Sequence, residues 1–178
     1  KIYLVTQRNV DSEDPTQEDL YQMGIVADIK QVVRLQNDVV RILVDGISRA
    51  ALLGFTGNEK YLEAEICYCD SNADSLPEDL REAMLLGVRE AFHRYAAVIG
   101  KISKELIRQI DQYEDLEKLI DYVTNNLPVS YELKQQVLEA EDINDRYQVI
   151  VSLLLSQVEV ISIKNELQKK VKVRVDVC

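Results

Sequence analysis

The sequence predicts an α+β protein in which a small antiparallel β-sheet or partial barrel precedes an α-helical bundle that ends in a long helix. Two changes along the chain predict this fold. Apolar residues alternate with a period of two over the first third, and the period becomes helical after residue 74. In addition, no Gly or Pro interrupts residues 142–175. We therefore expect a β-rich domain over 1–70, a linker over 71–74 and a helical domain over 75–178.

The β-rich part is expected to consist of successive strands joined by short turns. An acidic loop over Asp11–Asp19 separates the first two strands, and Gln36, Asn37 and Asp38 form the next turn. Asp45–Gly46 is a second turn signal. The predicted strands are Lys1–Gln7, Met23–Leu35, Val39–Val44, Ile47–Phe55 and Tyr61–Cys69.

The helical part is predicted from caps and apolar stripes. Ser75 and Glu78 fit a capping box with Pro77 in the first turn, and Gly100 ends that helix. Further helices are expected from Ser103 through Ile110, over Leu116–Leu127 and over Tyr131–Ala140, the last of these capped by Ser130.

The last predicted helix begins at Asp142 and runs to about Val175. It would be on the order of 50 Å long. Its apolar seam follows Tyr147, Val151, Leu154, Val158 and Ile161, and then moves to Ile163, Leu167 and Val171. A helix of this length is expected to pack on the bundle with its first half and to project, or pair with another helix, with its second.

Composition argues against several classes of partner. Lys and Arg number 21 against 31 Asp and Glu, which leaves a net charge of −10 that repels nucleic acid. We expect no membrane association, because no apolar run approaches the roughly 18 residues that a bilayer requires. The three cysteines, Cys67, Cys69 and Cys178, are expected to be reduced, which is typical of a cytoplasmic protein.

The residues predict no catalytic centre. Gly100-Lys101-Ile102-Ser103 superficially resembles a phosphate-binding loop, but it follows a helix and has no Ser or Thr directly after the lysine. His93 is the single histidine, and a structural role in its helix is expected. Metal-ligand spacings are absent as well. We therefore expect no catalytic, cofactor-binding or metal-binding residues, and no enzymatic activity in this chain.

Two stretches of the sequence resemble the amino-terminal region of bacterial Lon-type ATP-dependent proteases. The first is Ile2–Ala50, with IYLVTQ, MGIVADIKQVVRL and the run VRILVDGISR at Val40–Arg49. The second is Asn126–Glu159, with NLP, KQQVLE and DINDRYQVIVSLL. This resemblance implies a PUA-like β lobe, a helical bundle and a long helix leading toward an ATPase.

The resemblance also implies a function. The parent protein would be an ATP-dependent serine endopeptidase that degrades misfolded or regulatory proteins, with its Ser–Lys dyad and its ATP and Mg²⁺ site downstream of this chain. The chain itself would bind unfolded or damaged substrates and assist self-association, as a dimer alone or as a hexamer of the parent. Members of the family begin with a strand-and-helix segment that this chain lacks. We therefore expect an exposed sheet edge, filled by a neighbouring chain, a loop or a lattice contact.

Two short regions are candidates for protein binding. One is the turn at Leu35, Gln36 and Asn37, and the other is the late-helix series Ile163, Leu167 and Val171. A stand-alone LON-domain protein that acts as a ligand-binding adaptor is the alternative function. RNA binding by analogy with PUA domains would rest on fold alone, and the net charge of −10 disfavours it.

Overall fold

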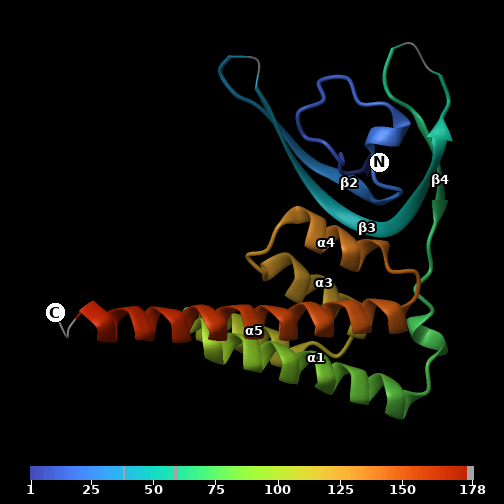
Figure 1. Cartoon of the computed structure of the whole chain (residues 1–178). Helices are drawn as coiled ribbons and strands as arrows, with labels where there is room; N and C mark the ends of the chain where they lie inside the picture. Colours follow the sequence, from blue (N-terminus) through green and yellow to red (C-terminus); the bar gives the residue numbers. More distant parts are fainter. Residues whose placement is uncertain (38, 58–59, 176–178) are drawn as a thin grey trace. The chain divides into compact units, whose positions relative to one another are not determined.

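The computed structural model describes residues 1–37, 39–57 and 60–175, the last four of these by backbone alone. Its elements are four β-strands, two short 3-10 helices and five α-helices within that described part. The chain divides into two compact units, Lys1–Asp70 and the remainder from Ser71 onwards. All four strands lie in the first unit and all five α-helices in the second (Figure 1).

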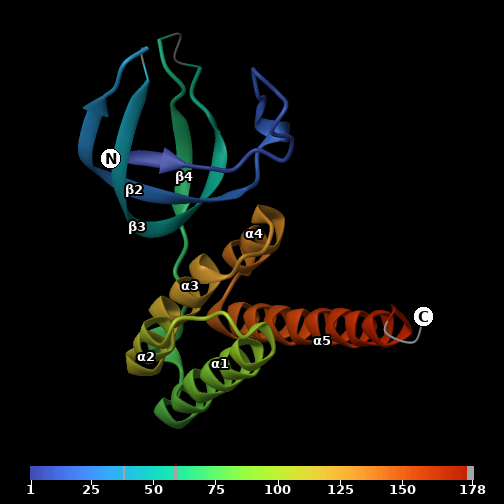
Figure 2. The same cartoon turned by 90° about the vertical axis from the view of Figure 1, so that its left-hand side faces the viewer.

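The first unit is an antiparallel sheet with strand order β1-β2-β3-β4, in which each strand pairs with its neighbour in sequence. The strands curve around an open interior and do not close into a barrel (Figure 2). Leu20, Val26, Ala27, Ala50 and Leu52 are its buried apolar residues. The strands are β1 (Ile2–Leu4), β2 (Met23–Arg34), β3 (Val40–Phe55) and β4 (Ala64–Tyr68).

The turn predicted at Asp45–Gly46 is wrong, because β3 runs through it without a break. The register slips at this point: Val26 pairs with Ser48, whereas Ala27 pairs with Gly46, so Ile47 is the extra residue of a β-bulge. Gly46 lies at this bulge, where an added Cβ would meet the Ile25 side chain at 3.4 Å, within ordinary van der Waals contact. The expected strand over Tyr61–Cys69 is also shorter, since β4 begins only at Ala64.

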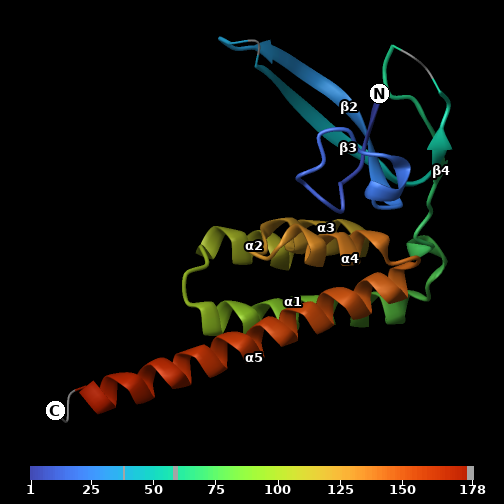
Figure 3. The same ribbon diagram turned by 45° about the horizontal axis from the view of Figure 1, so that its top comes forward.

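The second unit contains helices α1 to α5. In Figure 3, α1 lies beside α5, and α2, α3 and α4 form a layer over this pair. Their buried residues make one apolar core, to which α5 contributes Ile143, Ile150 and Leu154 without exposed surface. The helices are α1 (Glu78–Ile99), α2 (Lys104–Gln112), α3 (Leu116–Asn126), α4 (Tyr131–Glu139) and α5 (Ile143–Val175).

Most predicted helix ends are confirmed by local geometry. Gly100 ends α1 with a φ of 64°, the left-handed conformation that glycine adopts without strain. Ser103 caps α2 by accepting a hydrogen bond from the Leu106 N–H at 3.1 Å, and Asp142 caps α5 through the Asp145 N–H at 2.9 Å.

The capping box predicted at Ser75 and Glu78 is wrong. Ser75 belongs to the 3-10 helix Ala73–Ser75, where its hydroxyl donates to the Asn72 carbonyl at 2.7 Å. Pro77 therefore stands at the N-cap of α1, without a side-chain hydrogen bond. Ser130 likewise stands at the N-cap of α4 but its side chain makes no capping bond.

The first half of α5 packs in the core and the second half does not. Core contacts of α5 continue to Ile161, and beyond that residue the helix extends past α1 (Figure 3). Within the described residues, α5 is also the one helix that is long and apolar enough, over Ile143–Val171, to cross a membrane by length and composition. The expectation that no segment approaches this length is therefore wrong. A core helix passes the same test, but only 17% of the apolar window of α5 is buried in this structure.

Candidate functional site

An apolar cleft of about 700 Å³ lies inside the open sheet of the first unit. Its walls come from β1 on one side and from β4 with the preceding segment on the other, while Pro15 of the acidic loop and Leu20 directly after that loop also line it. Clefts of this size are typical of ligand sites. The main apolar and aromatic residues that line it are Ile2, Tyr3, Val26, Phe55, Leu62, Ile66 and Tyr68.

Two sets of hydrogen bonds, one made by Tyr3 and one between Thr16 and Asp19, position residues of the cleft walls. The Tyr3 hydroxyl donates to the Ala50 carbonyl at 3.0 Å, and burial raises the pKa of Tyr3. In the acidic loop, the Asp19 carboxylate accepts hydrogen bonds from both the backbone N–H and the hydroxyl of Thr16, at 2.8 Å each. These bonds, the backbone bond foremost, lower the pKa of Asp19. The loop that carries Leu20 into the cleft is therefore ordered by its own capping box.

A second apolar surface lies on the outer part of the β2–β3 hairpin, residues 29–44, which we call the ribbon. In the described chain, β1 pairs with β2 only at residues 25–27 and β4 pairs with β3 only at residues 50–55, so the ribbon is two-stranded. Opposite residues share a face. The pairing of Val32 with Ile42 and of Gln31 with Leu43 therefore places aliphatic side chains on both faces. The exposed aliphatic residues are Ile29, Val32, Val33, Leu35, Val39, Val40, Ile42 and Leu43.

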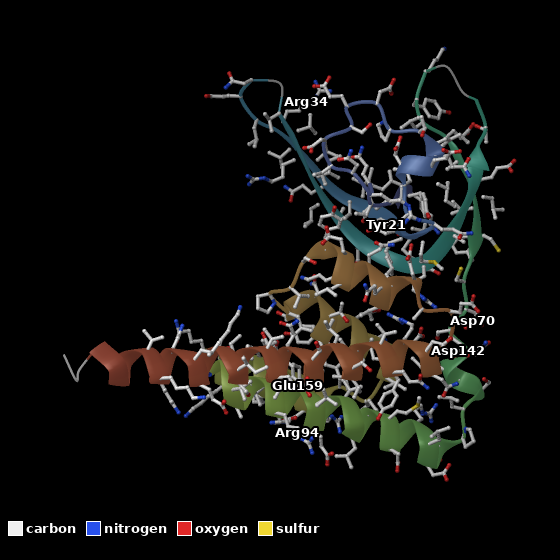
Figure 4. All side chains as sticks on the ribbon, in the orientation of Figure 1. Tyr21, Arg34, Asp70, Arg94, Asp142 and Glu159 are labelled. Carbon is white, nitrogen blue, oxygen red and sulfur yellow. The ribbon has the colours of Figure 1, made fainter. Side chains whose placement is uncertain are left out.

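The ribbon is unusual in leaving both of its faces to solvent. The Val32 side chain is 54% exposed and Leu43 is 59% exposed, although they lie on opposite faces. Arg34 lies near the outer end, away from the rest of the sheet (Figure 4). A monomeric protein rarely leaves a contiguous aliphatic surface bare, and such surfaces commonly mark protein-binding sites.

The predicted turn residues lie at the tip of this ribbon. The Leu35 N–H donates to the Val39 carbonyl at 2.8 Å and closes the turn. Asn37 has a φ of 63°, which asparagine tolerates better than most residues. Leu35 is exposed and continues the apolar face, whereas Gln36 and Asn37 are exposed polar residues. Asp38, the last residue of the predicted turn, lies outside the described residues.

The predicted late-helix residues form a bare stripe on the second half of α5. Ile163, Leu167 and Val171 are 58%, 57% and 62% exposed. Their spacing of four keeps them on one side of the helix. This stripe belongs to the second unit and the turn residues belong to the first, so the six candidates are divided between the two units.

The other polar residues singled out from the sequence are His93 and the cysteines. The His93 Nε2 atom lies 2.8 Å from Asp111 Oδ1, which ties α1 to α2. Cys67 and Cys69 are free thiols, while Cys178 lies outside the described residues. Among the residues that the structure describes, no group of three or more His, Cys, Asp or Glu could hold a metal ion.

Sequence reasoning missed most of the ribbon and the cleft as sites. The signal for the ribbon was present: VVRL and VVRILV carry aliphatic residues at both parities, whereas a strand with one solvated face alternates. The cleft had a weaker signal, the alternation of Leu62, Ala64, Ile66 and Tyr68, which is also the pattern of an ordinary half-buried strand.

Comparison with known proteins identifies the family to which the chain is similar. The chain is 35% identical over 176 residues to the Lon protease of Lachnoclostridium phytofermentans, and this match covers 99% of the chain and 22% of that protein. It is 31% identical over 174 residues to the Lon protease of Clostridioides difficile, again with 22% of that protein covered. The chain thus spans about a fifth of the length of the curated relatives it matches.

The fold is shared with a solved structure, the N-terminal domain of the Mycobacterium avium complex Lon protease. The two superpose with a TM-score of 0.65 at 17% identity, and the match covers 86% of this chain and 89% of that one. The family model described as the ATP-dependent protease La (LON) substrate-binding domain matches residues 1–156. This chain therefore belongs to the family of Lon substrate-binding domains.

Proposed function

We propose that this chain is the non-catalytic substrate-recognition and assembly region of an ATP-dependent Lon-type serine protease that degrades misfolded or regulatory proteins. The observation that carries the proposal is the ribbon, with exposed aliphatic side chains on both faces. Unfolded and damaged proteins differ from folded ones chiefly by their exposed apolar segments. A bare aliphatic ribbon binds such segments by burying apolar area, without reading a defined sequence.

Assembly is the second part of the proposal, and the exposed stripe on α5 supports it. A helix whose stripe Ile163, Leu167 and Val171 meets no core is suited to pair with another helix. We propose that this pairing gives self-association of the chain and contributes to a hexamer of the parent. The chain itself would use no cofactor, and the parent would use ATP and Mg²⁺ in the cytoplasm.

Changing the ribbon tests the recognition role. We expect the double variant Val40→Thr/Ile42→Thr to bind a reduced and alkylated, permanently unfolded model protein more weakly than the unaltered chain. Threonine keeps the β-branched shape of a strand residue and removes apolar contact area. At about 1 kcal/mol for each of the two lost contacts, the dissociation constant should rise roughly thirtyfold. Fluorescence anisotropy of the labelled unfolded protein measures this change.

The matched control is Gln31→Thr, which makes the same replacement at a polar position of the same ribbon. Its affinity should equal that of the unaltered chain. If the double variant also binds unfolded protein as tightly as the unaltered chain, the ribbon is not the recognition surface. If the unaltered chain captures no unfolded protein at all, the proposed function is wrong.

A ligand-binding adaptor is the alternative, and the cleft of about 700 Å³ is the observation that favours it. Saturable binding of a small molecule together with no affinity for unfolded protein would support this alternative. The curated relatives argue against it, because they are named as proteases and extend far beyond the length of this chain.

A further inference from the structure

The ribbon carries charge as well as aliphatic side chains. Residues 29–44 contain the basic residues Lys30, Arg34 and Arg41 and a single acidic residue, Asp38, so the segment has a formal charge of +2 in a chain whose total is −10. The local charge of the ribbon is therefore opposite in sign to that of the whole chain. Salt screens the long-range field of a protein, whereas charged side chains within a contact surface act directly on the bound partner.

The two arginines are the basic residues of the ribbon without an acidic partner in the part of the chain that the structure describes. Lys30 lies 3.6 Å from a carboxylate oxygen of Asp45. Among the described residues, Arg34 and Arg41 take part in no ion pair, and both are exposed. Two guanidinium groups of the ribbon can therefore pair with carboxylates of a bound segment.

The strand register distributes the two arginines over the two faces of the ribbon. Arg41 is opposite Val33, and Arg34 is opposite Val40. Opposite residues share a face and successive residues alternate between faces, so Arg41 and Arg34 lie on different faces. Each guanidinium thus stands beside an exposed valine, Val33 on one face and Val40 on the other. An apolar segment that covers either face brings its polar residues close to an arginine.

An arginine among aliphatic side chains favours a carboxylate as its partner. The guanidinium group is weakly hydrated, and it pairs with a carboxylate through two parallel N–H···O bonds. Apolar contact around this pair excludes water, which makes the attraction stronger than that of a fully exposed pair. A cationic side chain at the same place would meet a like charge with less water to screen it. Both faces of the ribbon therefore favour an apolar segment that contains Asp or Glu.

We propose that Arg34 and Arg41 determine the specificity of the ribbon, so that it selects apolar segments that carry acidic residues and disfavours those that carry basic ones. This inference rests on the proposed function and names the class of segment within it. The net charge of −10 predicts the opposite preference, because an acidic protein attracts basic peptides. Exposed charges on strands also prevent aggregation, but that role requires no preference for either charge in a bound segment.

Three labelled peptides that differ only in charge test this selection. Each contains the apolar core Val-Phe-Val-Leu, flanked on both sides by Asp, by Gln or by Lys residues. We expect the Asp peptide to bind the unaltered 178-residue chain about tenfold more tightly than the Gln peptide, and the Lys peptide to bind more weakly than either. Fluorescence anisotropy measures the three dissociation constants. Equal affinities, or a preference for the Lys peptide, would overturn the inference.

Charge reversal tests whether the arginines cause the selection. Arg34→Glu/Arg41→Glu should reverse the order, so that the Lys peptide binds more tightly than the Asp peptide. The matched control Lys101→Glu/Lys104→Glu makes the same change in net charge at exposed residues of the second unit, and should keep the original order. Circular dichroism checks folding, and Arg34→Gln/Arg41→Gln, which should lose the preference for the Asp peptide, replaces a reversal variant that does not fold. A variant that keeps the original order shows that the arginines do not determine specificity.

The outcomes separate this inference from the proposed function. If Val40→Thr/Ile42→Thr weakens the capture of unfolded protein while the three peptides bind alike or not at all, the inference is wrong and the proposed function stands. If the unaltered chain captures no unfolded protein, the proposed function fails. If the chain forms a dimer that Arg34→Glu/Arg41→Glu dissociates, the occupant of the ribbon is an acidic surface of a second copy, which overturns the client segment as the occupant. Sedimentation velocity detects this case.

Discussion

Arg146 is the largest side chain that the structure buries fully, and it holds three helices of the second unit together. Its guanidinium makes ion pairs with Glu117 at 3.5 Å and with Asp121, both on α3, and its Nε donates to the Val137 carbonyl of α4 at 3.4 Å. The two carboxylates are partly exposed, so the desolvation cost of the pairs falls mainly on the arginine. Both the buried hydrocarbon stem and the charge of Arg146 therefore contribute to the stability of the second unit.

At this scale we predict that Arg146→Ala lowers the free energy of unfolding by about 2–4 kcal/mol, through a cavity and an unpaired Val137 carbonyl. The carboxylates of Glu117 and Asp121 are already partly exposed, so water can solvate them in the variant at little cost in free energy. The control Arg108→Ala breaks an exposed pair with Glu105 on the same helix, and should cost under about 1 kcal/mol. Urea denaturation followed by circular dichroism measures both. Equal losses of unfolding free energy in the two variants would show that the contacts of Arg146 stabilise the protein no more than an exposed ion pair does.

At the scale of the element, β1 is a three-residue strand whose close approach to β2 depends on a glycine. A Cβ on Gly24 would lie 2.4 Å from the Leu4 carbonyl oxygen and 2.7 Å from the Tyr3 ring. The carbonyl is backbone and cannot move without displacing the strand. Gly24 therefore allows β1 to reach the position in which Tyr3 lines the cleft.

We predict that Gly24→Ala destabilises the first unit by about 1–3 kcal/mol, because the methyl group overpacks the β1–β2 contact. Gly54→Ala is the matched control, since a Cβ there meets its nearest neighbour at an ordinary 3.7 Å. Hydrogen exchange of the β1 and β2 amides should accelerate in the first variant and remain unchanged in the second. An unaffected Gly24→Ala variant would contradict the close approach.

At the scale of the whole molecule, two units expose apolar surface in different ways. The first unit exposes it on the ribbon, where the described residues of β2 and β3 pair with each other, and in the cleft. The second exposes it on α5 beyond Ile161, where none of the described side chains belongs to the core. Recognition and assembly are therefore proposed for separate units, and changes in one need not disturb the other.

For assembly we predict that the chain self-associates with rising concentration, and that Leu167→Ser/Val171→Ser reduces this association at least roughly tenfold by removing two apolar knobs. The control Asn165→Ser/Lys169→Ser has the same spacing on the opposite side of α5. Sedimentation equilibrium reports the mass of each. If the unaltered 178-residue chain stays monomeric at high concentration, the stripe is not an interface. The same follows if the control variant loses as much self-association as Leu167→Ser/Val171→Ser does.

The particular elements show how far sequence reasoning extends. Gly100, Ser103 and Asp142 were predicted correctly because a cap depends on residues within one turn of it. Asp45–Gly46 predicts a turn, but the same dipeptide lies at a bulge here because β2 pairs opposite it. Ser75 does not cap α1, because its hydroxyl donates to the Asn72 carbonyl instead.

The sequence by itself determined the α+β class, the order of the elements, the length of α5 and the family, since period, caps and motifs are local properties of the chain. Only the tertiary structure decided which apolar residues are left bare. Val32 and Val26 are alike in sequence terms, yet one is 54% exposed and the other 3%. The difference arises from where β1 and β4 end, because burial depends on partners that are distant in the chain. The cleft and the ribbon follow from those endings.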